Sequence, residues 1–364
     1  MKLKTWLKKG KLAVLFVALT LVFVMVCAAC NSSKDNTDSG NVTNDDSKKV
    51  EDANTDSDTD SELKTIRIAT PSSGNVLSDN AMLAEKLGYI EEELEKAGYK
   101  AEYVGFANAG PGINEAFVAG QIDYAFYNEL PAMMAKSNGI DLKIIATITQ
   151  QFNYALFVTE QSGITSLKDL EGKRVIAAQG TILYKYIKSL CEKNDVDFSK
   201  IEVINSLSDA NSILASGEAD AYSCGYTSAL LLEEQGIGTT LTNTTEDLEE
   251  STGITLTARA SVLESDLESA KAIIRALKRA SEYAAENPDK VYALLETETS
   301  SEELLKQLYS YDTSFSYFSP TLSDDYRKKV QIQYDFAKEN QMLGGEVNLD
   351  ELLDSTYVDE IMAE

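Results

Sequence analysis

The sequence contains no histidine among its 364 residues. This absence excludes every catalytic system that depends on an imidazole, such as a Ser-His-Asp or Cys-His nucleophile, and every zinc site with histidine ligands. Carboxylates and lysines can still act as acids, bases or nucleophiles, so the absence disfavours an enzyme but leaves that chemistry open. We therefore expect a protein that is not an enzyme and that needs no metal ion or other cofactor.

Positive charge and cysteine are also scarce. The chain has 33 lysine and arginine residues against 59 aspartate and glutamate residues, which gives a formal net charge of −26. Nucleic acid requires a basic face and anionic lipid would repel such a chain, so a soluble extracellular protein fits this balance best. Two of the four cysteines, Cys191 and Cys224, lie in the body of the chain. We expect them to be unpaired buried thiols, with a disulfide between them as the alternative.

The first 63 residues carry the pattern of an exported and tethered protein. Lysines precede an apolar, uncharged run over residues 12–29, and together these form the two parts of a secretory signal. The run ends in a sequence that resembles the bacterial lipoprotein cleavage box, which predicts a signal peptide over residues 1–30 and acylation of Cys30. The alternative is an uncleaved membrane anchor. Residues 31–63 are poor in apolar side chains and predict a disordered acidic linker.

The segment from Leu167 to Thr181 is the clearest structural signal in the body of the chain. Its apolar residues at 175–178 predict a short strand that is buried on both faces of a sheet. Gly180 and Thr181 then open an amphipathic helix, and the Thr181 side chain can cap the first turn. A helix that begins at the carboxyl end of a parallel strand points free N–H groups at a crevice, so we expect a small solute to bind there.

Two segments of the body resemble each other. Residues 117–125 and 213–221 each contain a helix end, a glycine, an aspartate and a strand, with one extra residue in the second segment. We therefore predict two similar α/β units whose strand ends face a shared gap. Extended apolar runs at 153–159 and 253–258 have no helix start, and we interpret them as the two crossings between the units.

These crossings define the predicted domains. The first lobe comprises residues 64–154 and 254–364, and the second lobe comprises residues 155–253. A single helix is expected to run from residue 79 to residue 94, and a capping box that begins with Ser300 is expected to start a later helix. The C-terminal helices are expected to pack back on the first lobe.

Three segments are distinctive in their order and spacing: MLAEKLGYIEEELEKAGYKAEYVGF, AGPGINEAFVAGQIDYAF and SLKDLEGKRVIAAQGT. They resemble the solute-binding subunits of ABC importers, and in particular the nitrate, sulfonate, taurine and thiamine-precursor binding proteins. The resemblance covers residues 65–340. It implies an α/β protein with the type II periplasmic-binding-protein fold, in which two α/β lobes are joined by two hinge strands and hold a ligand between them.

In this fold, ligand contacts come from strand ends and helix N-termini that face the gap between the lobes. The expected ligand-binding residues are Ser72, Ser73, Gly74, Gly110, Tyr127, Asn128, Glu129, Phe152, Tyr154, Gln179, Gly180, Thr181, Tyr184, Tyr222 and Tyr226. This set offers hydroxyls, amides and aromatic rings but no arginine. An anion would therefore have to be held by helix ends and hydroxyls.

The expected class of ligand depends on Glu129. A buried carboxylate at this position would oppose a sulfonate or nitrate and would favour an amino group on a heterocycle that stacks on tyrosines. A solvated carboxylate at the start of a helix would have no such effect. Both a ligand of the sulfonate, nitrate or taurine type and a ligand of the thiamine-pyrimidine-precursor type therefore stay open.

The resemblance implies a function in transport. The expected protein is a monomeric, lipid-anchored subunit on the extracytoplasmic face of the cell membrane. It would capture a small polar or anionic organic solute by hinge closure and deliver it to the permease and ATPase subunits of an ABC importer. Nucleic acid is not an expected partner. The alternatives are an enzyme of the pyrimidine-precursor type on the same fold, whose histidine chemistry is missing here, and a ligand-sensing surface lipoprotein.

Overall fold

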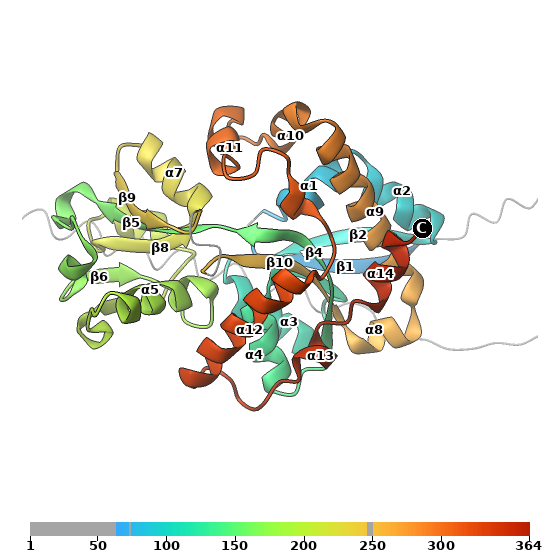
Figure 1. The fold of residues 1–364 in the computed structure, drawn as a ribbon, viewed down its shortest axis with the longest axis horizontal. Helices are drawn as coiled ribbons and strands as arrows, with labels where there is room; N and C mark the ends of the chain where they lie inside the picture. The colour runs from blue at the N-terminus through green and yellow to red at the C-terminus, as the bar shows by residue number, and fades with distance from the viewer. Residues whose placement is uncertain (1–62, 73, 246–249) are drawn as a thin grey trace, which may run out of the picture. The chain divides into compact units, whose positions relative to one another are not determined.

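Two five-stranded mixed sheets with helices around them make up the part of the chain that the computed structural model describes, residues 63–72, 74–245 and 250–364 (Figure 1). These residues belong to one compact unit. The predicted signal peptide with Cys30, the predicted linker as far as residue 62, and Ser73 lie outside the described residues. Within the described residues, no helix is both long enough and apolar enough to cross a membrane.

The first sheet has the strand order β2-β1-β3-β10-β4. Strand β1 pairs in parallel with β2 and β3, whereas β10 runs antiparallel to both β3 and β4. Every residue of β10 except the last is buried, because this strand has neighbours on both sides and both faces of the sheet are covered. The strands are β1 (Lys64–Thr70), β2 (Tyr99–Gly105), β3 (Tyr124–Asn128), β4 (Leu142–Phe152) and β10 (Thr252–Arg259).

The second sheet repeats this plan with the order β7-β6-β8-β5-β9. Strand β6 pairs in parallel with β7 and β8, and β5 runs antiparallel to β8 and β9. The two similar sequence segments lead into β3 and β8, which hold the same position in their sheets, so the predicted pair of α/β units is confirmed. The strands are β5 (Tyr154–Thr159), β6 (Arg174–Ile176), β7 (Glu202–Ile204), β8 (Ala221–Gly225) and β9 (Gly238–Asn243).

The chain passes between the two sheets twice. Asn153 alone separates β4 from β5, and residues 244–251 separate β9 from β10. The Asn153 Oδ1 atom accepts hydrogen bonds from Gln151 Nε2 at 2.8 Å and from Thr244 Oγ1 at 3.1 Å. The bond from Thr244 fastens the outgoing crossing to the returning one. The first run predicted as a crossing, residues 153–159, begins at the crossing residue Asn153 and continues as β5. The second, residues 253–258, lies within β10, after its crossing.

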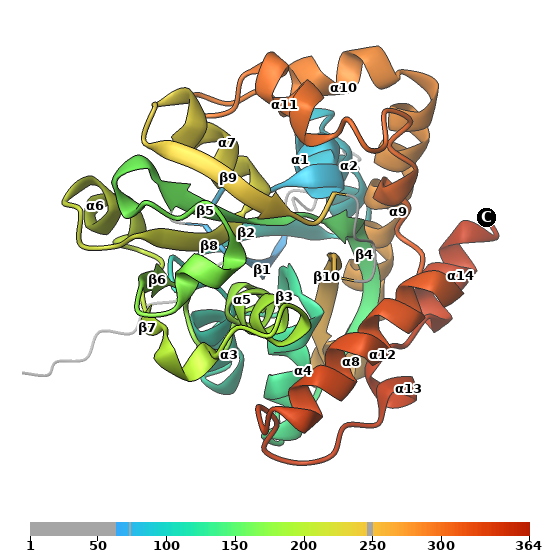
Figure 2. The same ribbon diagram turned by 60° about the vertical axis from the view of Figure 1, so that its left-hand side comes forward.

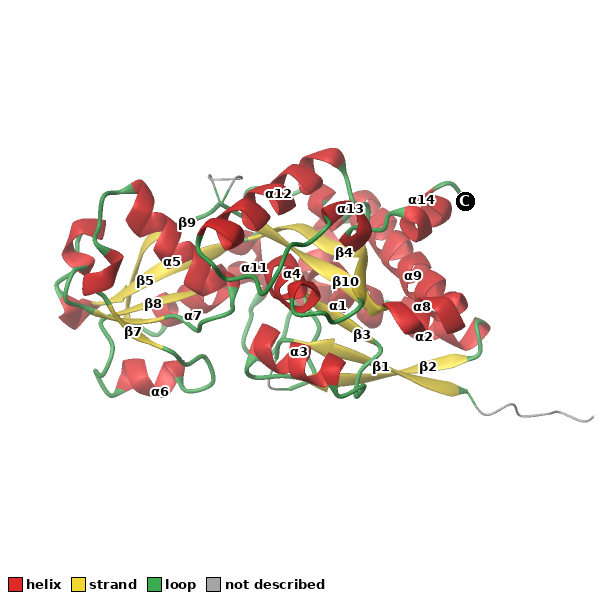
Figure 3. Ribbon diagram, turned by 90° about the horizontal axis from the view of Figure 1, so that it is seen from below, coloured by secondary structure: helices red, strands yellow, loops and turns green. Residues whose placement is uncertain are grey.

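Helices that follow the second crossing return to the first sheet. The buried face of α9 packs against α1, α2 and α14, and α12 packs against α4 and β10 (Figure 3). Helix α11 also contacts α7, which belongs to the second sheet (Figure 2). The helices are α1 (Asp79–Lys86), α2 (Tyr89–Lys96), α3 (Ala109–Val118), α4 (Glu129–Ser137), α5 (Ile182–Lys193), α6 (Ala210–Ala215), α7 (Tyr226–Glu234), α8 (Ala260–Ser265), α9 (Leu267–Glu286), α10 (Pro288–Leu295), α11 (Glu302–Leu308), α12 (Asp324–Glu339), α13 (Leu349–Leu352) and α14 (Thr356–Met362).

Two local predictions about helices are wrong. The single helix expected from residue 79 to residue 94 is two helices, because Gly88 has φ of 72° and this left-handed backbone ends α1 before α2 begins. The N-cap of α11 is Ser301 and not Ser300. Its Oγ atom accepts a hydrogen bond from the Leu304 N–H at 3.2 Å.

Candidate ligand-binding site

The turn between β1 and α1 holds Ser72 and Gly74 of the predicted ligand-binding set. The Ser72 Oγ atom accepts a hydrogen bond from the Val76 N–H at 3.0 Å, and the Asn75 Oδ1 atom accepts one from the Gly105 N–H at 2.6 Å. Asn75 has φ of 56°, a conformation that asparagine adopts more readily than most residues. These bonds tie Ser72 to Val76 and Asn75 to Gly105, and Gly74 is exposed.

Two predicted glycines bring elements of the two sheets into contact. A Cβ atom at Gly110 would lie 2.5 Å from the Pro131 Cβ atom and 3.7 Å from the Gly180 carbonyl oxygen. A Cβ atom at Gly180 would lie 3.4 Å from the Pro111 Cγ atom and 3.6 Å from the Met134 Cε atom. The turn before α5 therefore packs directly on α3 and α4, and residues without a side chain permit this approach.

Thr181 caps helix α5, as predicted. Its Oγ1 atom donates a hydrogen bond to the Ala178 carbonyl at 2.7 Å and accepts one from the Tyr184 N–H at 3.4 Å. The neighbouring Gln179 N–H donates to Asn205 Oδ1 at 2.8 Å. Side-chain and backbone groups thus fix the orientation of this helix start toward α3 and α4.

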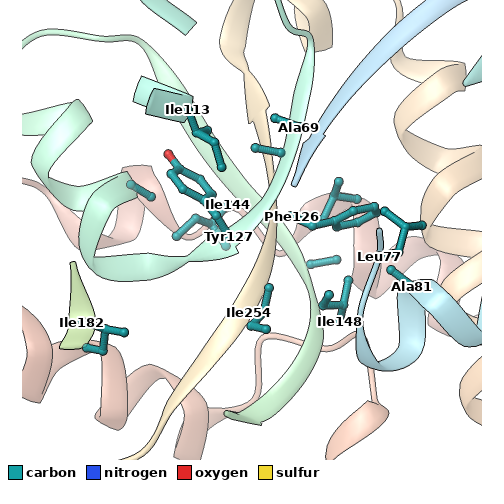
Figure 4. Close-up of a cluster of buried hydrophobic side chains, with 14 of the residues drawn as sticks. Ala69, Leu77, Ala81, Ile113, Phe126, Tyr127, Ile144, Ile148, Ile182 and Ile254 are labelled. Atoms are coloured by element: carbon teal, nitrogen blue, oxygen red, sulfur yellow. The ribbon is translucent and has the colours of Figure 1, made fainter. Parts of the chain in front are cut away.

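Tyr127 and Asn128 connect β3 to its neighbours. Tyr127 is almost fully buried and lies in the hydrophobic cluster that also contains Ile113 (Figure 4). Its hydroxyl donates a hydrogen bond to Asn114 Oδ1 at 3.3 Å. The Asn128 Nδ2 atom donates to the Gly253 carbonyl at 2.8 Å. These two contacts join β3 to α3 and to the start of β10.

Glu129 is fully buried at the start of α4. Its Oε1 atom accepts a hydrogen bond from the Thr252 hydroxyl, and its Oε2 atom accepts one from the Tyr326 hydroxyl at 3.4 Å. Burial raises the pKa of the Glu129 carboxyl, although the Thr252 bond and the nearby Lys329 oppose this effect. The alternative of a solvated carboxylate at a helix start is therefore wrong.

Three predicted tyrosines of the second sheet are packed against other parts of it. The rings of Tyr154 and Tyr186 meet edge-on with 4.8 Å between their centroids, and those of Tyr184 and Phe198 meet edge-on at 5.7 Å. Tyr222 is buried on β8. Edge-on aromatic pairs of this kind stabilise the interior of a sheet and its covering helices.

A cavity of 220 Å³ lies where the two sheets meet. Its walls come from α1 and the turn before it, from the crossing at residues 151–153, from Thr227 on α7, and from a C-terminal segment within residues 295–311. Of the predicted ligand-binding residues, Phe152 is part of this wall. Tyr226 precedes Thr227, and a hydrogen bond links its side chain to that of Gln307 on α11. Elements of both sheets therefore enclose the same space.

Asp79 is the charged residue among the described residues that line this cavity. Its Oδ1 atom accepts a hydrogen bond from the Tyr309 hydroxyl at 2.9 Å. Burial raises the pKa of the Asp79 carboxyl to about 6, and the hydroxyls of Ser78 and Tyr309 oppose this rise. The sequence places Ser78 and Asp79 at a helix start, but no sequence signal connects them with Tyr309, which lies 230 positions later.

Gln151 connects the cavity to helix α12. Its Oε1 atom accepts hydrogen bonds from Lys329 Nζ and from Ser251 Oγ, both at 2.8 Å. Lys329 Nζ also donates to the Gln150 carbonyl at 3.0 Å. Burial lowers the pKa of Lys329 to about 8, and Glu129 opposes this effect. The ammonium group therefore holds both crossings between the sheets.

The described residues contain no group of three or more cysteine, aspartate or glutamate side chains that could hold a metal ion. Cys191 on α5 and Cys224 on β8 are free and buried, which confirms the prediction of unpaired thiols. Burial raises the pKa of Cys191 to about 11 and raises that of Cys224 as well, so both keep their protons at neutral pH.

Two mixed sheets of matching strand order, two crossings between them and a cavity at their junction define the type II periplasmic-binding-protein fold. The family model described as NMT1/THI5 like matches residues 80–291, which is more than half of the chain. The chain belongs to this family.

Known proteins share parts of the sequence or the fold. The chain is similar to a Bacillus subtilis (strain 168) protein described as an aliphatic sulfonates-binding protein, with 31% identity over 121 residues that span 33% of this chain and 35% of that protein. It is also similar to the structure of the sulfonate-binding protein SsuA from Methylobacillus flagellatus KT, with a TM-score of 0.68, 23% identity, and coverage of 83% of this chain and 94% of that chain.

An enzyme has the same fold. The structure of the desulfurization enzyme DSZB matches with a TM-score of 0.64 and 14% identity, over 82% of this chain and 99% of that chain. The fold is thus common to binding proteins and to at least one enzyme, and the function of this chain has to be argued from its own residues.

Proposed function

We propose that the chain is the solute-binding subunit of an ABC importer. It captures a small organic solute between a first lobe, residues 64–154 and 254–364, and a second lobe, residues 155–253. A solute that bridges the lobes stabilises the closed arrangement by its higher affinity for that arrangement, and the closed form docks on the permease. No covalent step is required.

The position of the cavity carries this proposal. Asp79 and Phe152 contribute to its wall from the side of the first sheet, and Thr227 contributes from α7 of the second sheet. A solute in this space contacts both sheets and the crossing between them. At a second place, the close approach of Gly110 on α3 to Gly180 before α5 joins an element of the first sheet to one of the second, as closure of two lobes requires. The rest of the predicted ligand-binding set stays a set of proposed contacts.

The mature protein is proposed to be a monomer anchored to the extracytoplasmic face of the cell membrane through acylated Cys30. Its partners are then the permease and ATPase subunits of the importer. The sulfonates-binding relative supports the solute-binding part of this proposal over the third of the chain that it matches. Metabolic labelling with radioactive palmitate should mark the wild type but not a Cys30→Ala variant.

Ligand-induced closure tests the function. Thermal-shift screening with sulfonates, nitrate, taurine, aminopyrimidines and amines should find compounds that raise the melting temperature, because a ligand at a hundred times its Kd stabilises the folded state by about 2.7 kcal/mol. Small-angle scattering should show a smaller radius of gyration in the presence of the same compound. Phe152→Leu should weaken both effects, whereas Phe336→Leu, which changes a ring on α12 outside the cavity wall, should not. Stabilisation without any change in radius would count against hinge closure.

An enzyme is the second candidate, because DSZB has the same fold. Against it, the chain has no histidine, and its two body cysteines are buried and protonated at neutral pH. Mass spectrometry of a stabilising solute after long incubation with the protein distinguishes the two candidates. A binding protein returns the solute unchanged, and an enzyme converts it.

A further inference from the structure

We infer that the cavity between the sheets selects a small solute with a protonated nitrogen, which the carboxylate of Asp79 binds directly. This inference rests on the proposed function and names the class of solute. It begins from the composition of the wall. Apart from Asp79, the described residues that line the cavity are uncharged.

Among the described residues, no charged side chain pairs with the buried carboxylate of Asp79. The groups that hydrogen-bond to it are the hydroxyls of Tyr309 and Ser78, which are neutral donors. A buried carboxylate is unfavourable unless a cation pairs with it. A ligand ammonium group in the cavity would supply that cation and would form a charge-assisted hydrogen bond with the free positions on the carboxylate oxygens.

The rest of the wall suits the body of such a solute. Phe152, Tyr309 and Tyr311 present aromatic side chains to the cavity, and Met82 and Leu305 present apolar ones. The face of an aromatic ring attracts a cation, and it also packs against the apolar part of a solute. Since a cavity of about 150 Å³ holds a benzene molecule, a cavity of 220 Å³ has room for one ring with a short aminoalkyl group.

The same wall opposes a sulfonate or a nitrate. An anion in this space would lie close to the Asp79 carboxylate in a low-dielectric environment, where like charges repel strongly. Thr227 lies in the first turn of α7, and the N-terminus of that helix brings only a partial positive charge against the full negative charge of Asp79. We therefore expect the specificity of this chain to differ from that of its sulfonates-binding relative.

Three probes of matched shape and different charge test the inference: benzylamine, benzyl alcohol and benzenesulfonate. Titration calorimetry on the mature protein at pH 7.5 should show the tightest binding for benzylamine, weaker binding for benzyl alcohol and none for benzenesulfonate. Asp79→Asn should weaken benzylamine binding by roughly thirtyfold or more and leave benzyl alcohol unchanged, because it removes one partner of a buried charge pair. The matched control is Glu95→Gln, which removes a carboxylate from the exposed face of α2 and should change nothing.

The wild type provides an independent measurement. Benzylamine stays protonated from pH 5 to pH 8, whereas the pKa of Asp79 is about 6. The affinity of the protein for benzylamine should therefore fall as the pH drops below 6, while its affinity for benzyl alcohol stays constant. The other titratable groups facing this carboxylate are Tyr309 and Tyr311, whose pKa values burial raises above 10. Lys329, which hydrogen-bonds to Gln151, has a pKa of about 8, so it stays protonated over the pH range in which Asp79 titrates.

The outcomes distinguish failure of this inference from failure of the proposed transport function. Binding of benzenesulfonate by the wild type, or benzylamine binding that does not depend on pH, would overturn the inference and leave the transport proposal standing. If amines, sulfonates and all other screened solutes fail to stabilise the folded protein, the proposed function and the inference fail together.

Discussion

Asp123 and Asp220 occupy equivalent positions in the two sheets. The Oδ2 atom of Asp123 accepts the backbone N–H of Arg67 in β1, and the Oδ2 atom of Asp220 accepts that of Arg174 in β6, both at 2.9 Å. Each carboxylate also forms an ion pair, Asp123 with Arg259 and Asp220 with Arg174. The repeated aspartate in the sequence therefore joins the second and third strands in the order of each sheet, β1 to β3 and β6 to β8.

The variant Asp220→Asn should lower the free energy of unfolding by about 1–2 kcal/mol at pH 7, because it weakens charge-assisted hydrogen bonds from Arg174. Those hydrogen bonds hold the pKa of Asp220 below its usual value. A carboxyl with a lowered folded-state pKa contributes stability above its unfolded pKa, and this contribution is lost as the pH falls through the folded pKa. Urea titrations should thus show a difference between wild type and variant that shrinks below about pH 4. A difference of constant size would contradict this account.

Glu129→Gln should stabilise the protein increasingly as the pH rises. The raised pKa of Glu129 means that the folded state favours the neutral acid, which glutamine mimics, so the wild type loses stability as the pH rises through the folded pKa. We expect no difference near pH 5 and a gain of about 1 kcal/mol near pH 8, measured by calorimetry. The control Tyr326→Phe removes a donor to the same carboxyl and should destabilise the protein at both pH values. Growing destabilisation of Glu129→Gln with pH would show instead that attraction to Lys329 dominates.

Lys185 and Glu250 form a buried ion pair at 2.5 Å between α5 and the returning crossing. Ser189 also donates a hydrogen bond to Glu250 at 2.7 Å. Lys185→Met should lower the free energy of unfolding by about 3 kcal/mol, because it leaves a buried carboxylate with fewer charged partners. Lys188→Met, on the same helix, should cost less than about 1 kcal/mol in the same urea titration. Equal losses for the two variants would mean that the buried pair adds nothing specific.

Gly180→Ala should affect both stability and closure. Gly180 and Gly172 have φ of 77° and 78°, so alanine at either position should cost about 1–2 kcal/mol of backbone strain. At Gly180 the new Cβ atom would be in van der Waals contact with α3 and α4, 3.4 Å from Pro111 and 3.6 Å from Met134, whereas no atom of the described residues lies within 4 Å at Gly172. A further approach of α5 to α3 during closure would turn these contacts into a clash, so Gly180→Ala alone should weaken ligand binding in calorimetry. If Gly172→Ala weakens it equally, the contact between α5 and α3 plays no part in closure.

Local patterns in the sequence predict the elements of this fold better than they predict its site. The strand near residue 175, the cap at Thr181 and the repeated segments follow from residue periodicity and turn chemistry, which act over a few positions. Asp79 and Tyr309 meet across 230 positions, and no periodic pattern carries that information. Glu129 looks like an ordinary acidic residue at a helix start, and it is the hydroxyls of Thr252 and Tyr326, from distant elements, that enclose it.

Gln151 belongs at once to the wall of the cavity and to the set of acceptors around Lys329. A solute that hydrogen-bonds to the Gln151 amide would weaken the hydrogen bond between that amide and the ammonium group of Lys329 on α12. Occupancy would then be transmitted to a helix that does not line the cavity among the described residues, and a fluorophore attached to α12 would sense a guest that it never touches.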